Sequence, residues 1–289
     1  MRLHEPVEVR AATEADLAAI AAIAQATGQD EDWQNVFPRY VRHVMAHGRF
    51  LVAERASVLT GYGAALRIGE GPRSVSMLTD LFVDPVVHGT GTGRAILAAL
   101  WQDEPRRMTF SSLHAHALPL YTSFGLDAWW PLLYLRGEVR RLTMPAGWSV
   151  SPATAAQVAS LEESWTGLDR AAEHAMWAAW PNGSGVIACL HGRPVATGTA
   201  GGAAAEYGIS HLVTDPGAAT GEAAADAVAA VLSWLEPADG RARICLPAPH
   251  PATRTLLAAG WRVAEFDLHM ASEPGLIDPR STAPSPALA

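Results

Sequence analysis

The pattern of apolar and polar residues over positions 80–101 predicts a strand, a loop and a helix. Residues 81–83 form an apolar run typical of a buried strand, whereas the apolar residues of 96–101 recur on one helical face. Three glycines separate the two elements, at positions 89, 91 and 93. Glycine allows the backbone to approach a ligand closely, and the first turn of a helix offers free N–H groups to an anion. The pattern therefore predicts a pyrophosphate site, with a tight turn that binds no ligand as the alternative.

The rest of the first half alternates predicted strands and helices. Thr13 and Asp16 form a capping box that opens a helix with apolar residues on one face. A second helix is predicted over residues 33–46, where Trp33 and Phe37 are candidates either for an acceptor pocket or for the core. Strands are predicted at residues 7–9, 50–53, 59–66, 74–83, 107–115 and 130–138, and a short helical turn at 118–123.

Four landmarks of this first half occur again, in the same order. Thr13 corresponds to Thr154, Gly61 to Gly198, Asp84-Pro85 to Asp215-Pro216 and Gly125 to Gly260, at offsets of 131 to 141 residues. Such a series indicates a tandem duplication of one domain. We therefore expect a first domain over residues 1–143, a linker over 144–147 and a second domain over 148–274. Residues 275–289, rich in Pro, Ser and Ala, are expected to form a disordered tail.

Charge and composition narrow the class of protein. The 29 acidic residues against 21 basic residues give a net charge of −8, which argues against a nucleic-acid-binding surface. The sequence shows no signal-peptide pattern and no apolar, uncharged run of about 18 residues, so a cytoplasmic protein that does not enter a membrane is expected. Cys189 and Cys245 lie in separate apolar runs and are expected to be buried free thiols.

Two runs of residues carry a resemblance to a known family. Residues 83–97 combine Asp-Pro with the three glycines and an apolar helix, and residues 120–126 read Leu-Tyr-Thr-Ser-Phe-Gly-Leu. Together with the opening residues 10–16, these runs resemble motifs of the GNAT superfamily of N-acetyltransferases, although His88 stands where Gln or Arg is usual. The resemblance covers nearly the whole chain and is weaker in the second half. It implies an α/β fold with a mixed sheet, in two tandem GNAT-like acyl-CoA N-acyltransferase domains.

The resemblance implies which residues would bind an acyl-CoA. The backbone of the strand would hydrogen-bond the pantetheine arm, and the loop amides would hold the pyrophosphate. The implied cofactor-binding residues are Leu81, Phe82, Val83, His88, Gly89, Thr90, Gly91, Thr92, Gly93 and Arg94. Acetyl-CoA or another acyl-CoA is the expected co-substrate, and no metal is expected.

The resemblance also implies direct attack of an amine on the thioester, with Tyr121 as the proton donor to the CoA sulfur. Asp80, His114 and His116 are candidates for the general base; a structural or solvent-exposed role is the alternative for each. The expected function is an acetyl-CoA-dependent N-acetyltransferase acting on a primary amine of a small molecule or peptide. The alternative is a non-catalytic acyl-CoA-binding protein with a regulatory or interaction role.

The second copy lacks residues that this chemistry needs. Glu222 stands at the place of Gly91, Ala224 at the place of Gly93 and Leu256 at the place of Tyr121. Because a carboxylate repels a pyrophosphate, we expect this copy to be non-catalytic. Its expected role is to pack on the first domain, to line the acceptor cleft or to form a homodimer interface. A mycothiol-synthase-like enzyme also has two tandem copies, but there the C-terminal copy is the one that resembles the active domain.

Overall fold

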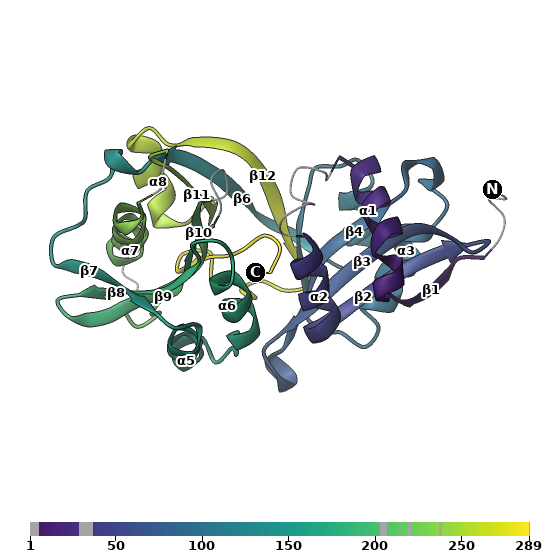
Figure 1. Cartoon of the computed structure of the whole chain (residues 1–289), viewed down its shortest axis with the longest axis horizontal. Coiled ribbons are helices and arrows are strands. Elements are labelled where there is room, and N and C mark those ends of the chain that lie inside the picture. Colours follow the sequence, from purple (N-terminus) through teal and green to yellow (C-terminus); the bar gives the residue numbers. More distant parts are fainter. Residues whose placement is uncertain (1–5, 29–36, 203–206, 219–220, 237–238, 289) are drawn as a thin grey trace. The chain divides into compact units, whose positions relative to one another are not determined.

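The computed structural model describes residues 6–28, 37–202, 207–218, 221–236 and 239–288. The chain divides into two compact units, both drawn in Figure 1. The first unit comprises Met1–Arg67 and Val75–Thr109, and the second comprises Ile68–Ser74 and Phe110–Ala289. Apart from short 3₁₀ turns and the last strand, one order of elements occurs twice: strand, two helices, three strands, helix, strand, helix, strand. This order agrees with a tandem duplication.

The first unit is built on a mixed sheet in which the strands follow the order β1, β2, β3, β4 and β5. The β1–β2 and β2–β3 pairs are antiparallel, and the β4–β5 pair is parallel. The strands are β1 (Glu8–Ala11), β2 (Gly48–Arg55), β3 (Val58–Ile68), β4 (Val75–Val83) and β5 (Arg107–Ser111). The helices are α1 (Leu17–Ala26), α2 (Phe37–His47) and α3 (Thr92–Leu100), with 3₁₀ turns η1 (Glu14–Asp16) and η3 (Pro85–Val87).

Local sequence signals account for several of these elements. The Asp16 carboxylate accepts hydrogen bonds from the backbone N–H and the hydroxyl of Thr13, as the predicted capping box requires. Glycines on β3 let α3 lie close to the sheet, since a Cβ on Gly63 would be 2.6 Å from Cγ2 of Ile96. The helix predicted from Trp33 is described only from Phe37 onwards, and Trp33 lies outside the described residues.

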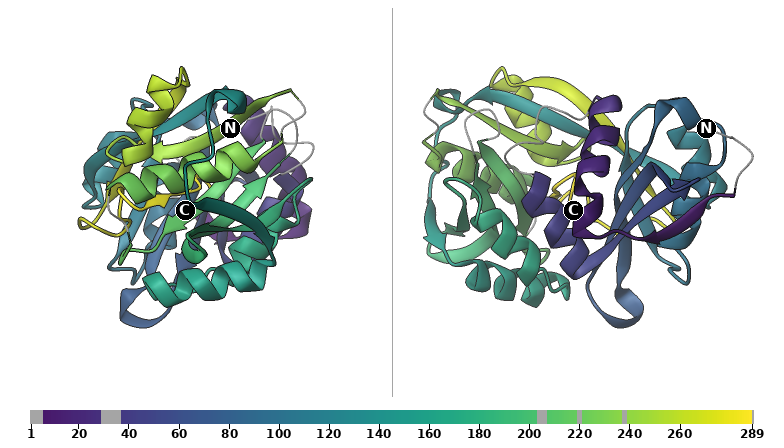
Figure 2. Two further views of the ribbon diagram at one scale, coloured as in Figure 1. Left: turned by 90° about the vertical axis from the view of Figure 1, so that its left-hand side faces the viewer. Right: turned by 45° about the vertical axis from the view of Figure 1, so that its right-hand side comes forward.

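The second unit contains a second run of strands, in the order β12, β6, β11, β10, β9, β8 and β7, with β13 also paired to β10. Figures 1 and 2 show α7 and α8 on one face of this sheet and α5 and α6 on the other. The strands are β6 (Asp127–Glu138), β7 (Trp148–Ala153), β8 (Ser184–Leu190), β9 (Arg193–Gly201), β10 (Gly208–Thr214), β11 (Arg241–Pro247), β12 (Arg262–Ala271) and β13 (Thr282–Ala283). The helices are α4 (Ala117–Ser123), α5 (Ala155–Thr166), α6 (Ala171–Ala178), α7 (Gly221–Trp234) and α8 (Pro251–Ala258), with 3₁₀ turns η2 (Gly71–Arg73) and η4 (Val139–Arg141).

Strand β6 changes the expected domain boundary. It precedes the predicted linker, yet it lies between β11 and β12 and pairs antiparallel with both. Two of its side chains, Leu132 and Leu135, are fully buried. The last strand of the first repeat therefore belongs to the second unit, and the units divide at Thr109 and Phe110 instead of at residues 144–147. The alternation of apolar residues predicted the strand but could not specify its partners.

The segment expected to be a disordered tail is ordered and packed up to Leu288. Residues of β13 pair with β10, Leu212 with Ala283 and Val213 with Thr282. Three apolar side chains of this segment are buried, with Leu276 8%, Ala283 2% and Leu288 1% exposed. Composition suggested disorder because the segment has few apolar residues, but Leu276, Ala283 and Leu288 pack into the second unit.

Two further expectations concern the chain as a whole. Both cysteines are free; Cys245 is buried and Cys189 is half-buried. None of the helices in the described part of the chain is long and apolar enough to cross a membrane.

Candidate active site

The glycine-rich loop joins β4 to α3 through η3 and two left-handed residues. Gly89 has φ +76° and Gly91, the N-cap of α3, has φ +89°. Both angles lie in the region that L-residues with a side chain rarely adopt. A Cβ at either position would meet no atom of the described residues within 4 Å, so the loop surface is open there. The first turn of α3, which leaves its N–H groups without intrahelical acceptors, opens beside Gly91.

Contacts from the sheet hold this loop in place. The Asp84 N–H donates to the carbonyl oxygen of Thr60 at 2.9 Å, and the Asp84 side chain accepts from the N–H of Val86. Arg55, on β2 and only 5% exposed, donates from Nη2 to the carbonyl oxygen of Thr90 at 2.7 Å. No sequence motif marks Arg55, because it lies 35 residues before Thr90 and belongs to neither of the two motif runs.

The polar side chains of the loop bond to the loop itself. The Thr90 hydroxyl donates to the carbonyl oxygen of Val87 at 2.7 Å, and His88 Nε2 lies 2.9 Å from the carbonyl oxygen of Val83. Thr92 is 1% exposed, and its hydroxyl lies 3.3 Å from that of Thr90. These side chains fix the loop shape, so the main-chain N–H groups are the donors best placed for an anion.

Strand β4 extends beyond its parallel partner. The pairs join Ser76 to Arg107, Met77 to Met108 and Leu78 to Thr109. The strand continues past Leu78 to Val83, and residues 79–83 are all partly exposed. This end of β4 therefore offers backbone groups at the place where the pantetheine arm was expected.

Asp80 lies on this same end of β4, beside a buried tyrosine. The Tyr40 hydroxyl, from α2, donates to the Asp80 carboxylate, and the Thr79 hydroxyl lies 3.5 Å from the same oxygen. Burial raises the pKa of Asp80 to about 6, an effect that the hydrogen bonds from Tyr40 and Thr79 partly offset. A carboxylate with this pKa can accept a proton near neutral pH and release it again.

The other predicted catalytic residues lie in the second unit. Tyr121 is on α4 and is 7% exposed. His114 and His116 are exposed in the turn after β5, with ring centroids 5.4 Å apart, because that strand ends at Ser111 instead of at residue 115. Of the base candidates, Asp80 alone lies on the same strand as the predicted pantetheine-binding residues.

The second repeat carries a different polar cluster at the corresponding positions. An offset of 131 residues relates Asp80 on β4 to His211 on β10. Offsets of 134 and 137 relate Tyr40 to His174 and Tyr62 to Thr199, again on corresponding elements.

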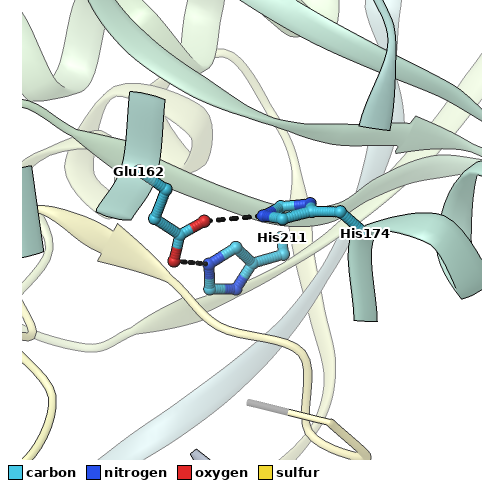
Figure 3. Close-up of side chains that lie close together, drawn as sticks. All are labelled: Glu162, His174 and His211. Carbon is cyan, nitrogen blue, oxygen red and sulfur yellow. Dashed lines mark hydrogen bonds and ion pairs between the residues drawn. The ribbon is translucent and has the colours of Figure 1, made fainter. Parts of the chain in front are cut away.

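Glu162, on α5, holds this cluster together, and Figure 3 shows its carboxylate bonded to both imidazoles. His174 Nε2 lies 2.7 Å from Oε2 of Glu162, and His211 Nε2 lies 3.0 Å from Oε1. Nδ1 of His174 lies 2.8 Å from the Thr199 hydroxyl. No local motif marks this cluster, because its members lie on four different elements, α5, α6, β9 and β10.

Charge is balanced within the cluster. Burial by itself would raise the pKa of Glu162, but His211, His174 and Arg170 together hold that pKa below its ordinary value, while burial lowers the pKa of His211. Potential metal-ligand atoms of Glu162, His174 and His211 lie within 4.8 Å of one another. A cation would have to displace their mutual hydrogen bonds and face the Arg170 guanidinium, whose Nε is 3.5 Å from the carboxylate. These contacts fit a hydrogen-bonded network better than a metal centre.

Comparison with known proteins identifies the class to which this loop and strand belong. Residues 46–125 match the family described as acetyltransferase (GNAT) domain. That range includes β2, β3, β4, the glycine loop, α3 and Tyr121. The chain thus contains a GNAT acetyltransferase domain, and its sheet is the mixed α/β sheet expected from the sequence.

Solved structures share the fold of the whole chain. A structure described as a putative acetyltransferase from Pyrococcus horikoshii matches with a TM-score of 0.71 and 14% identity, over 98% of this chain and 95% of that one. A GCN5-related N-acetyltransferase from Kribbella flavida matches with a TM-score of 0.62 and 16% identity, over 97% and 75%. A tandem GNAT protein from the clavulanic acid biosynthesis pathway matches with a TM-score of 0.59 and 14% identity, over 94% and 100%. Comparison with curated protein sequences gives no match.

Proposed function

We propose that this protein is an acyl-CoA-dependent N-acetyltransferase whose acyl-CoA loop and general base lie in the first repeat. The observation that carries the proposal is the position of Asp80 on the part of β4 that extends beyond its ladder with β5 and leads directly into the glycine loop. Acetyl-CoA is the proposed co-substrate. The proposed acceptor is a primary amine of a small molecule or peptide. The Asp80 carboxylate would attract this amine in its protonated, ammonium form.

Each proposed step uses residues of this chain. The loop N–H groups and the positive end of the α3 dipole would bind the pyrophosphate, and the backbone of Leu81, Phe82 and Val83 would hold the pantetheine arm. Asp80 would accept a proton from the acceptor ammonium, and the free amine would attack the thioester carbon. As the carbon–sulfur bond breaks, Tyr121 would give its proton to the departing thiolate and regain one from water. The role of Tyr121 rests on its motif.

The second repeat is proposed to be non-catalytic. Glu222 lies in the first turn of α7, where the first repeat has its glycines, and Leu256, at the place of Tyr121, is fully buried on α8. A carboxylate in that helical turn would repel a pyrophosphate. A regulatory protein that binds acyl-CoA without turnover is the second candidate function.

An assay of thiol release with acetyl-CoA and a panel of amines tests the proposal. We expect acceptor-dependent release by the wild-type chain and a loss of roughly 10²-fold or more in kcat for Asp80→Asn, because that change removes a general base. Asp103→Asn is the matched control: the residue is exposed, and asparagine tolerates its left-handed φ of 62°. If calorimetry shows that CoA binds but no amine of the panel causes thiol release, the regulatory candidate is favoured.

A further inference from the structure

The C-terminal segment lies along the strand of the second repeat that corresponds to β4. Leu212 pairs with Ala283 and Val213 with Thr282, and the Thr214 N–H donates to the carbonyl oxygen of Ser281 at 2.8 Å. The parallel pairing of β10 with β11 covers Gly208 and Ile209. Beyond Ile209, β10 therefore pairs with β13.

The repeat offset places this contact on the proposed pantetheine strand. At 131 residues, Leu212, Val213 and Thr214 correspond to Leu81, Phe82 and Val83. The two parallel ladders end at corresponding residues, since β4 pairs with β5 up to Leu78 and β10 pairs with β11 up to Ile209. In each repeat the strand then continues past this ladder, and in the second repeat the chain's own C-terminal segment pairs with the continuation.

The segment also ends at the polar cluster of the second repeat. Arg170 Nη1 donates to the carbonyl oxygen of Leu288 at 2.9 Å, and Arg170 Nε lies 3.5 Å from the Glu162 carboxylate. Both Arg170 and Leu288 are almost fully buried, with 4% and 1% exposure. The antiparallel pairing carries the segment from Thr214 towards His211, which corresponds to Asp80. An acyl-pantetheine arm in the first repeat would run the same way, from the loop to the base.

We propose that residues 281–288 occupy a pantetheine-type groove that the second repeat has kept, and that they close it to acyl-CoA. The identity of the groove rests on the proposed function of the first repeat. A built-in occupant explains how the second repeat keeps a strand that extends past its parallel partner, although Glu222 and Ala224 stand at the places of Gly91 and Gly93. The groove would recognise a ligand that offers amide groups in an extended arm and carries no pyrophosphate, since Glu222 stands at the phosphate end.

The test uses a chain that ends at Ser272, a labelled peptide of residues 273–289 and unlabelled pantetheine as the probe. We expect the peptide to bind the shortened chain with one-to-one stoichiometry, to leave the full-length chain unlabelled and to be displaced by millimolar pantetheine. Binding of the peptide that pantetheine does not weaken would overturn the proposal and leave the segment a packing element. Failure of the peptide to bind a folded shortened chain would overturn it too.

A second variant covers the case in which the shortened chain does not fold. Ala283→Pro in the full-length chain removes a backbone donor within β13 and should free the segment while keeping every other residue. We then expect a second equivalent of bound pantetheine, where the wild-type chain binds one at most. An unchanged stoichiometry, with the segment released as judged by hydrogen exchange at residues 212–214, would contradict the proposal. Thiol release by the full-length chain is measured separately, so failure of the proposed acetyltransferase function is distinguished from failure of this inference.

Discussion

At the scale of single residues, the contact between Tyr40 and Asp80 influences the pKa of the proposed general base. Tyr40 comes from a helix whose pattern predicted only an apolar face, and its hydroxyl reaches Asp80 across 40 residues of sequence. Burial of Asp80 raises its pKa to about 6, and the Tyr40 hydroxyl limits that rise. The sequence placed Asp80 among three equal candidates; the tertiary contact separates it from the two exposed histidines.

Tyr40→Phe should move the pH dependence of the reaction. Without this donor the pKa of Asp80 rises above about 6, so the acid limb of kcat/KM should shift to higher pH, while the rate on the alkaline plateau is largely kept. The measurement is a pH profile of thiol release with one amine.

Tyr62→Phe serves as the control for this profile. It removes a hydroxyl from the same buried core, but the hydrogen bonds that act on Asp80 come from Tyr40 and Thr79. An acid limb that stays in place in Tyr40→Phe would argue against Asp80 as the group that titrates.

At the scale of elements, β2 supports α3 and its loop through two arginines. Arg55 donates to the carbonyl oxygen of Thr90, before the helix, and Arg49 donates to that of Leu100, at its last residue. Only the first contact touches the proposed pyrophosphate loop. Arg55 is thus a positioning residue, which acts on the ligand through the loop backbone.

Arg55→Met should weaken acyl-CoA binding more than it lowers turnover. Loss of a hydrogen bond from a charged group costs about 1.5–3 kcal/mol of free energy. Here part of that loss destabilises the loop conformation that would bind the pyrophosphate. We expect a rise in KM and in the calorimetric Kd for CoA of roughly tenfold, with a smaller change in kcat.

Arg49→Met is the matched comparison, because it removes the same kind of bond from the other end of α3. It should lower the melting temperature slightly and leave Kd unchanged. Equal effects of the two substitutions on Kd would mean that the arginines stabilise the helix generally and do not position the loop.

At the scale of the whole molecule, the two repeats and the two compact units do not coincide. The repeats follow the order of elements, whereas β6 of the first repeat pairs with β11 and β12 of the second. The second unit therefore contains residues from both repeats together with the C-terminal segment. Its buried histidines also give it a particular dependence on pH.

The second unit should lose stability as the pH falls below about 6.5. Burial lowers the pKa of His211, and it lowers the pKa values of His250 and His269 to about 4. Such a histidine stays neutral in the folded chain but takes up a proton when the chain unfolds. It adds up to about 1.4 kcal/mol per pH unit to the slope of the unfolding free energy against pH. The raised pKa of Asp267 acts in the opposite direction at more acidic pH.

Urea unfolding at a series of pH values measures this slope. His250→Asn is the informative variant, because the Nδ1 of His250 accepts from the N–H of Ala252 at the start of α8 and asparagine can cap a helix in the same way. We expect a smaller loss of unfolding free energy between pH 7 and pH 5 in this variant than in the wild type. Equal losses would show that His250 does not contribute to the pH dependence.

Features of this protein that depend on neighbouring residues could be predicted from the sequence. The capping residues Thr13 and Thr154 open their helices, Gly89 and Gly91 adopt left-handed angles, and the order of elements repeats. These features follow from backbone conformation and short-range periodicity, which a local pattern records.

Which distant elements meet could be learned only from the folded chain. The pairing of β6 with β11, the contact of Arg55 with the loop and the packing of the C-terminal segment on β10 each join residues far apart in the chain. The apolar pattern of a strand says that one face is buried but names no neighbour, and a buried polar group needs a partner that the sequence does not identify. For that reason the glycine loop could be predicted from the sequence. The contact of Arg55 with that loop and the packing of residues 281–288 on β10 could not.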